Sequence, residues 1–155
     1  MEAAGPSDEE IAARLAARPE ERWRELFARA DALTPADLRV AWGGGQEIEP
    51  GVIQMPYPVY GDAVMRICAL LGELGVVVVF GWPDWVRGNP LWPDGEGLDD
   101  APVADAARLA TAIIRGERFS DGTIGRALDH GAFQAVLRRL RRWFDEERPL
   151  AGRST

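Results

Sequence analysis

Three tryptophans near the middle of the chain are the residues best suited to bind something outside the molecule. Trp82, Trp85 and Trp92 lie within eleven residues, and indole rings are frequent anchors for partner proteins and for flat ligands. Pro83 favours a helical turn that brings Trp82 and Trp85 to one side. The structural alternative is that the rings cover the core where an irregular segment has little other apolar cover.

Polar and aromatic neighbours extend this candidate site. A few placed polar groups can orient a ligand in an otherwise apolar pocket, and two tyrosines precede the predicted central helix. One hypothesis is therefore a pocket between the Trp82–Trp92 loop and the Tyr57–Tyr60 segment, as in a small-molecule or nucleotide-binding enzyme, with Asp84 and Arg118 as polar groups. The candidate ligand- or partner-binding residues are Tyr57, Tyr60, Trp82, Asp84, Trp85, Arg87, Trp92 and Arg118.

Arg118 lies in a turn between two predicted helices. Gly116 is suited to end the first helix, Ser120 or Asp121 to cap the second, and we expect Phe119 to point inward. An arginine in such a turn either holds the loop through carbonyls and carboxylates or binds an anionic ligand.

A basic face on the last predicted helix is the candidate for nucleic-acid binding. With the preceding helix and Gly131 it resembles a helix-turn-helix in outline, and arginine clusters can contact phosphates. Acidic residues follow at once, so pairs four residues apart, Arg141 with Asp145 and Arg142 with Glu146, are expected to neutralise the face. The net charge of −7 also repels nucleic acid, which makes it an unlikely partner. The basic residues are Arg138, Arg139, Arg141 and Arg142.

Catalytic and metal chemistry find little support. The chain has no lysine, one histidine (His130) and one cysteine (Cys68), which excludes Schiff-base chemistry and makes a Cys/His zinc site implausible. Acidic residues gather between Asp84 and Asp100, but their spacing does not match a calcium loop, and a solvated acidic loop is the better interpretation. We expect no metal and no cofactor, and these residues favour a non-catalytic protein over an enzyme.

Apolar spacing predicts that most of the chain is helical. Two helices separated by Pro19 occupy the first 32 residues, and a short helix follows at 35–41. Residues 60–74 form the clearest central helix, and three more cover 101–115, 121–130 and 132–147. Pro50-Gly51 indicates a turn, and valines bounded by glycines predict a strand at 76–80 that could pair with 52–55.

These elements predict a mainly α fold: a compact multi-helix single domain with a small two-strand β element at mid-chain. We expect an N-terminal helical segment over 1–32, a helical core domain over 33–148 and a flexible tail over 149–155. The length of 155 residues and the 46% hydrophobic content suit a chain with a real core. No apolar run approaches the roughly 20 residues that span a bilayer, and a single cysteine fits a reducing cytosol. We therefore expect a cytoplasmic protein with no membrane contact.

Three segments together resemble one family. In order along the chain they are residues 51–60, 80–85 and 115–122, which read GVIQMPYPVY, FGWPDW and RGERFSDG. This pattern resembles a family of small uncharacterised bacterial proteins catalogued as a domain of unknown function, over about residues 33–147. The resemblance implies a bacterial stand-alone domain and supplies no activity, cofactor or catalytic residue.

The function that this sequence favours is a non-catalytic protein-interaction domain that uses the Trp82–Trp92 loop and neighbouring acids, with another protein as its partner. The alternatives are the enzyme pocket and nucleic-acid binding through the arginine-rich C-terminal helix. The sequence does not decide the oligomeric state.

Overall fold

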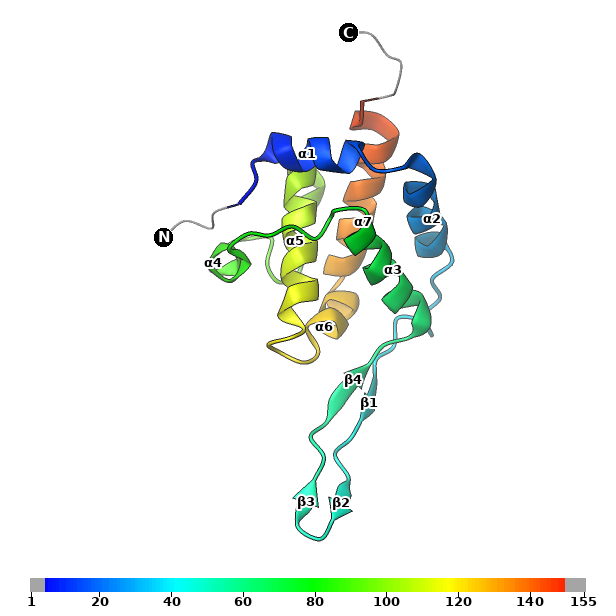
Figure 1. Ribbon diagram of the computed structural model, residues 1–155, viewed down its shortest axis with the longest axis vertical. Coiled ribbons are helices and arrows are strands. Elements are labelled where there is room, and N and C mark those ends of the chain that lie inside the picture. Colours follow the sequence, from blue (N-terminus) through cyan, green and yellow to red (C-terminus); the bar gives the residue numbers. More distant parts are fainter. Residues whose placement is uncertain (1–4, 150–155) are drawn as a thin grey trace.

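Two helices, α5 (Val103–Gly116) and α7 (Ala132–Arg142), pack side by side at the centre of the computed structural model, which describes residues 5–149 (Figure 1). Around them lie α1 (Asp8–Ala16), α2 (Glu20–Asp31), α3 (Asp62–Glu73), α4 (Trp82–Val86) and α6 (Thr123–His130). A 3-10 turn, η1 (Leu98–Asp100), precedes α5, and a π-helical turn, η2 (Trp143–Glu147), continues α7. The predicted mainly α fold is confirmed.

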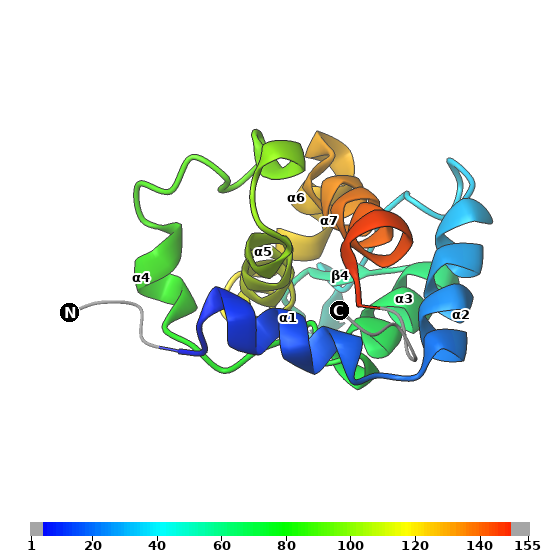
Figure 2. The same cartoon turned by 90° about the horizontal axis from the view of Figure 1, so that it is seen from above.

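The first two helices contribute to the same core as the rest of the domain. A capping box of Ser7 and Glu10 begins α1, which packs on α5, while α2 packs on α3. The indole of Trp23 on α2 lies 5.2 Å from that of Trp143 and donates a hydrogen bond of 3.2 Å to the carbonyl of Leu15. As predicted, two helices meet at Pro19. Helix α4 lies on the opposite side of α5 from α2 and α3 (Figure 2).

The predicted strand at 76–80 is wrong. Val76 and Val78 are buried on alternate positions as a strand would bury them, but the segment pairs with no strand. The buried hydroxyl of Thr111 on α5 bonds it instead: the Val78 N–H donates to Thr111 Oγ1 over 2.9 Å, and that hydroxyl lies 3.3 Å from the Val76 carbonyl. The valines therefore anchor an irregular chain that leads into α4.

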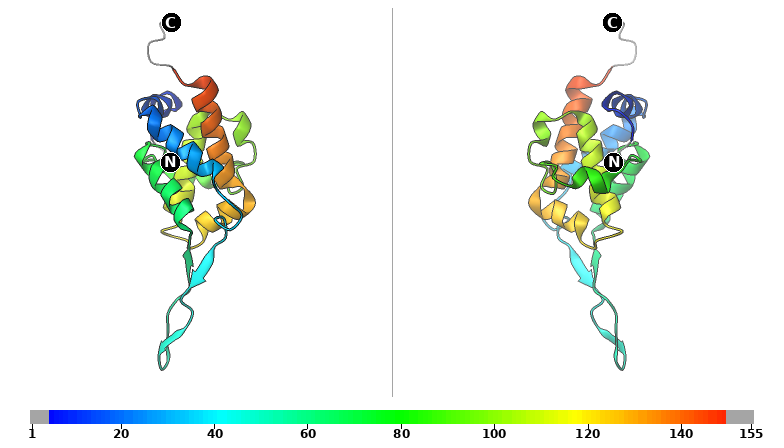
Figure 3. Two further views of the ribbon diagram at one scale, coloured as in Figure 1. Left: turned by 90° about the vertical axis from the view of Figure 1, so that its right-hand side faces the viewer. Right: turned by 90° about the vertical axis from the view of Figure 1, so that its left-hand side faces the viewer.

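Among residues 5–149, the β structure lies in a long hairpin, residues 41–59, which we call the arm. It projects from one end of the helical body (Figures 1 and 3). Strands β1 (Ala41–Gly43) and β4 (Tyr57–Val59) form its antiparallel base, and β2 (Glu47–Glu49) and β3 (Val52–Ile53) form its tip. The predicted turn at Pro50-Gly51 is confirmed, with φ +81° at Gly51.

The short helix predicted at 35–41 is also wrong. Its start signal does form, because Thr34 and Asp37 cap one another, with Thr34 N–H donating to the Asp37 carboxylate over 2.8 Å. The chain makes only one turn, since Ala41 and Trp42 pair with β4. Of the tail predicted at 149–155, residues 150–155 lie outside the described residues.

Candidate functional site

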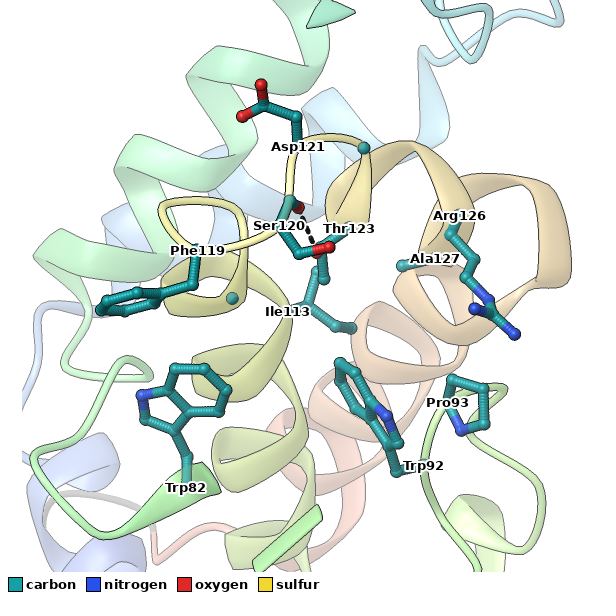
Figure 4. Close-up of a pocket in the computed structure, with 12 residues that line it drawn as sticks. Trp82, Trp92, Pro93, Ile113, Phe119, Ser120, Asp121, Thr123, Arg126 and Ala127 are labelled. Carbon is teal, nitrogen blue, oxygen red and sulfur yellow. Dashed lines mark hydrogen bonds between the residues drawn. The ribbon is translucent and has the colours of Figure 1, made fainter. Parts of the chain in front are cut away.

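A cavity of about 310 Å3 opens between two tryptophans and the turn that joins α5 to α6. We call it the indole cavity. Trp82, the first residue of α4, and Trp92, from the loop that follows, lie on opposite sides of it, with Ile113 of α5 between them at the back (Figure 4). The remaining lining residues are Pro93, Gly116, Phe119, Ser120, Asp121, Gly122, Thr123, Arg126 and Ala127.

The α5–α6 turn (residues 117–122) is fixed by one carboxylate. Glu117 accepts hydrogen bonds of 2.8 Å from the N–H groups of both Gly122 and Ile124. The Tyr60 hydroxyl donates to the same carboxylate over 2.7 Å and accepts from the Gly125 N–H over 3.1 Å. Glu117 therefore supplies, from within the chain, the negative charge that the N-terminus of α6 favours.

Tyr60 is suited to hold this turn because its hydroxyl keeps its proton. Burial raises the pKa of Tyr60 well above its ordinary value, and the hydrogen bond to Glu117 raises this pKa further. A protonated phenol is a donor to the carboxylate at any physiological pH. Tyr60 thus supports the rear of the turn and does not line the indole cavity.

The structure brings together only part of the predicted site. Trp82 and Trp92 face the cavity, but Trp85 packs edge-on against Phe80, 5.9 Å away, on the side of the core. The hypothesis placed the pocket between the Trp82–Trp92 loop and the Tyr57–Tyr60 segment, whereas the indole cavity lies against the α5–α6 turn.

The charged members of the predicted site lie outside the cavity. Asp84 and Arg87 form an exposed ion pair of 2.7 Å on α4. Arg118 is exposed and is not a lining residue. The only guanidinium on the lining belongs to Arg126 of α6, which the sequence analysis missed. Nothing in the spacing of α6 distinguishes Arg126 from the other exposed arginines.

Phe119 does not point inward as predicted. It is 80% exposed and lies at the rim, with its ring centroid 6.0 Å from that of Trp82 (Figure 4). Ser120 and Asp121 do not cap α6 through their side chains, because Glu117 bonds the free N–H groups first. The turn therefore presents Phe119 to the cavity mouth.

The arm forms a second candidate surface, of which the sequence analysis named only Tyr57 as a binding residue. Seven of the ten exposed large apolar side chains among residues 5–149 belong to it. The turn predicted at Pro50-Gly51 has β-branched residues near it on both sides. This pattern is typical of a hairpin. The seven side chains are Trp42, Ile48, Val52, Ile53, Met55, Tyr57 and Val59.

The basic face of α7 is neutralised, though by partners other than those predicted. Arg138 forms two bonds with Asp99 of η1, and Arg141 forms two with Asp31 of α2. Arg142 pairs with Glu147. Arg139, expected on the exposed face, is only 3% exposed and bonds the carbonyl of Ala101 and the carboxylate of Glu147. Each of these arginines holds an element of the fold, so the face offers no free cluster to phosphates.

The cysteine of the chain, Cys68, is half-buried against the core. Burial and the charge of Glu117 raise the pKa of the Cys68 thiol to about 11, which keeps it in the unreactive thiol form. Within residues 5–149, no three His, Cys, Asp or Glu side chains gather as metal ligands do. In the same part of the chain, no helix is long and apolar enough to cross a membrane.

Comparison with known proteins identifies a family. A family model described as a family of unknown function (DUF6508) matches residues 18–146, which confirms the resemblance found in the sequence. The match begins between α1 and α2 and includes the arm, the Trp82–Trp92 loop and the α5–α6 turn. No curated protein and no solved structure matches the chain.

Proposed function

The chain belongs to the DUF6508 family, and we propose that it is a non-catalytic protein-interaction domain that binds another protein through the arm. One observation carries the proposal: the arm projects from the body and exposes seven large apolar side chains. The sequence-based hypothesis assigned binding to the Trp82–Trp92 loop, and the arm now replaces that loop as the protein-binding surface.

The arm has more apolar surface than it can cover by itself. Its tip residues Ile48 and Ile53 are 61% and 66% exposed, and Met55 is 78% exposed. A two-stranded hairpin is marginally stable in water, where three strands or a supporting helix are normally needed. A partner that covers these side chains removes apolar area from water and completes the packing that the body does not provide.

The charge of the arm favours a partner with a basic surface. The arm carries two acids, Glu47 and Glu49, and no basic residue. The chain as a whole has a net charge of −7, so a second copy would meet the arm with charge of the same sign. A protein with an apolar groove bordered by lysine or arginine complements both the apolar residues and the acids.

A quantitative capture experiment with matched variants tests the proposal. The arm variant combines I53S with M55S, and the control is V79S, which alters an 83% exposed valine outside the arm. Proteins captured by the wild type are identified by mass spectrometry, purified, and titrated against all three forms by calorimetry. Each lost apolar contact is worth about 1.5–3 kcal/mol when buried, so we expect the arm variant to lose at least tenfold in affinity and V79S to lose none.

Two results would count against this function. One is that every purified binding protein has the same affinity for the wild type and the arm variant. The other is that light scattering shows a dimer of the chain itself that I53S/M55S dissociates, because the arm then binds a second copy. A binding protein with a basic surface, whose affinity falls as salt rises, supports the proposal.

Origin and location stay predictions. The single cysteine still favours a reducing compartment, and we propose a bacterial, cytoplasmic setting on that ground and on the family resemblance. Cell fractionation followed by immunodetection of the chain tests the location.

A further inference from the structure

We propose that the indole cavity binds a small, flat aromatic ligand that carries one carboxylate. The site is separate from the apolar side chains at the tip of the arm, and the proposal does not depend on the proposed protein partner. It rests on the placement of Trp82, Trp92, Phe119 and Arg126 around one cavity (Figure 4).

The walls of the cavity favour a flat ring. Trp82 and Trp92 approach from different segments and leave space between their indoles, and Ile113 closes the back. Phe119 lies at the mouth beside Trp82, where it can cover a bound ring. Aromatic faces gain most from another π system in an offset or edge-on arrangement. A volume of about 310 Å3 is at the small end of ligand sites, which suits a ligand of one or two rings.

The charge in the cavity favours one anionic group. Arg126 forms no ion pair and no side-chain hydrogen bond with any residue of 5–149, whereas the arginines of α7 are all paired with acids. The one acid among the lining residues, Asp121, points away from the tryptophans. A guanidinium presents its N–H donors in a fork that matches a carboxylate.

The local structure disfavours a polyphosphate. Phosphates commonly bind the free N–H groups at a helix N-terminus, but at α6 the N–H groups of Gly122 and Ile124 already bond Glu117, and that of Gly125 bonds Tyr60. A single arginine would face several phosphate charges in a chain of net charge −7. One carboxylate is the charge that one arginine balances.

Three probes of similar shape separate the contribution of the flat ring from that of the carboxylate. 2-Naphthoate has the flat ring and the charge, 2-naphthamide has the ring without the charge, and decalin-2-carboxylate has the charge without the aromatic ring. Each probe is titrated into the full chain, and calorimetry measures its affinity. The indole N–H signals in a two-dimensional proton–nitrogen NMR spectrum show where it binds. We expect naphthoate to bind at least tenfold more tightly than either of the other probes and to shift the indole signals of Trp82 and Trp92.

Two variants assign the binding to the cavity. R126Q is expected to lower naphthoate affinity about tenfold and leave naphthamide affinity unchanged, because only the charged contact is lost. R87Q, which alters an exposed arginine outside the cavity, is the matched control and is expected to change neither. Both positions are exposed, so the fold should persist, and circular dichroism of the variants verifies this.

Several results overturn the proposal. Equal affinities for naphthoate and naphthamide, or an unchanged naphthoate affinity in R126Q, remove the role of the carboxylate. Equal affinities for naphthoate and decalin carboxylate remove the role of the flat ring. The absence of naphthoate binding to the wild type at millimolar concentration removes the site.

Discussion

Replacing Tyr60 by phenylalanine removes one oxygen atom that joins three parts of the chain. Tyr60 directly follows β4 and precedes α3, and its hydroxyl reaches Glu117 at the end of α5 and Gly125 in α6. In Y60F the ring stays, so apolar packing is preserved. The loss is confined to two hydrogen bonds.

The expected loss of stability in Y60F follows from the two hydrogen bonds that are removed and from the groups that they leave without a partner. A hydrogen bond to a charged group contributes about 1.5–3 kcal/mol, and partial exposure of Tyr60 places this one at the lower end. Gly125 is buried, so its N–H loses its acceptor in a place that water does not readily enter, at a cost of about 1–3 kcal/mol. We expect Y60F to lower the free energy of unfolding by about 2.5–4.5 kcal/mol.

Urea denaturation followed by circular dichroism measures this change, and Y57F is the matched control. Tyr57 also lies on the arm side of the chain, but its hydroxyl has no hydrogen-bond partner among residues 5–149, so Y57F should change stability by less than about 0.5 kcal/mol. A double-mutant cycle of Y60F with E117Q isolates the pair. A loss in Y60F no larger than that in Y57F, or a coupling energy near zero, would refute the idea that this contact holds the turn.

Two further perturbations test the reasoning on the body of the fold. T111V keeps the shape of a fully buried residue but leaves the Val78 N–H without its acceptor. Urea denaturation should therefore show a loss of about 1–3 kcal/mol, and equal stability of T111V and wild type would contradict this. Hydrogen bonds from three arginines, of which Arg66 has the largest effect, hold the pKa of Glu25 at about 2 in the folded chain, below its ordinary 4.5. The stabilisation by Glu25 is therefore present above pH 4.5 and is lost as the pH falls towards 2, so the midpoint of thermal unfolding should fall less steeply over that range in E25Q than in the wild type, and parallel pH profiles would contradict it.

The helices could be predicted because the residues that determine each helix lie within that helix or next to it. Apolar residues at helical spacing marked the buried faces of α3, α5 and α7, and Pro19 marked the break between α1 and α2. The predicted helix at 132–147 has one difference, since the α-helix ends at Arg142 and a π-helical turn carries Trp143 and Phe144 into the core. Neither composition nor spacing distinguishes these two helical forms.

The sequence analysis predicted a small β element at mid-chain but placed one of its strands wrongly. Strand pairing depends on a partner elsewhere in the chain, which local composition does not identify. Val76–Phe80 has the composition of a strand, yet it pairs with no strand and its Val78 N–H donates to a buried threonine 33 residues away. Trp42 stands between Ala41 and a run of glycines, which is too short a segment to predict a strand alone, and it pairs with Pro58 of β4 across the hairpin. Gly44, with φ +75°, separates the base of the arm from the tip, and a side chain there would collide with the Met55 carbonyl.

Of the residues that line the indole cavity, two tryptophans were among the predicted site residues, and the arginine was not. Trp82 and Trp92 were recognisable by type and proximity, and both line the indole cavity. Arg126 belongs to an ordinary amphipathic helix, and it becomes notable only because the fold leaves it beside the cavity without an ion-pair partner among residues 5–149. The arginines of α7 show the converse, since a cluster that looked free in sequence is paired by acids from α2, η1 and η2.

The arm and the indole cavity depend on one small set of contacts. The Trp42 ring at the base of the arm lies against Gly122, where φ is +96° and a Cβ would stand 3.4 Å from the indole. The same glycine lines the cavity and donates its N–H to Glu117. Since Tyr60 connects the end of β4 to that carboxylate, Y60F should weaken naphthoate binding as well as stability, whereas I53S/M55S at the tip should leave naphthoate binding unchanged. A Y60F protein that binds naphthoate with wild-type affinity would show that the cavity keeps its shape without this contact, and that the base of the arm and the cavity are built independently.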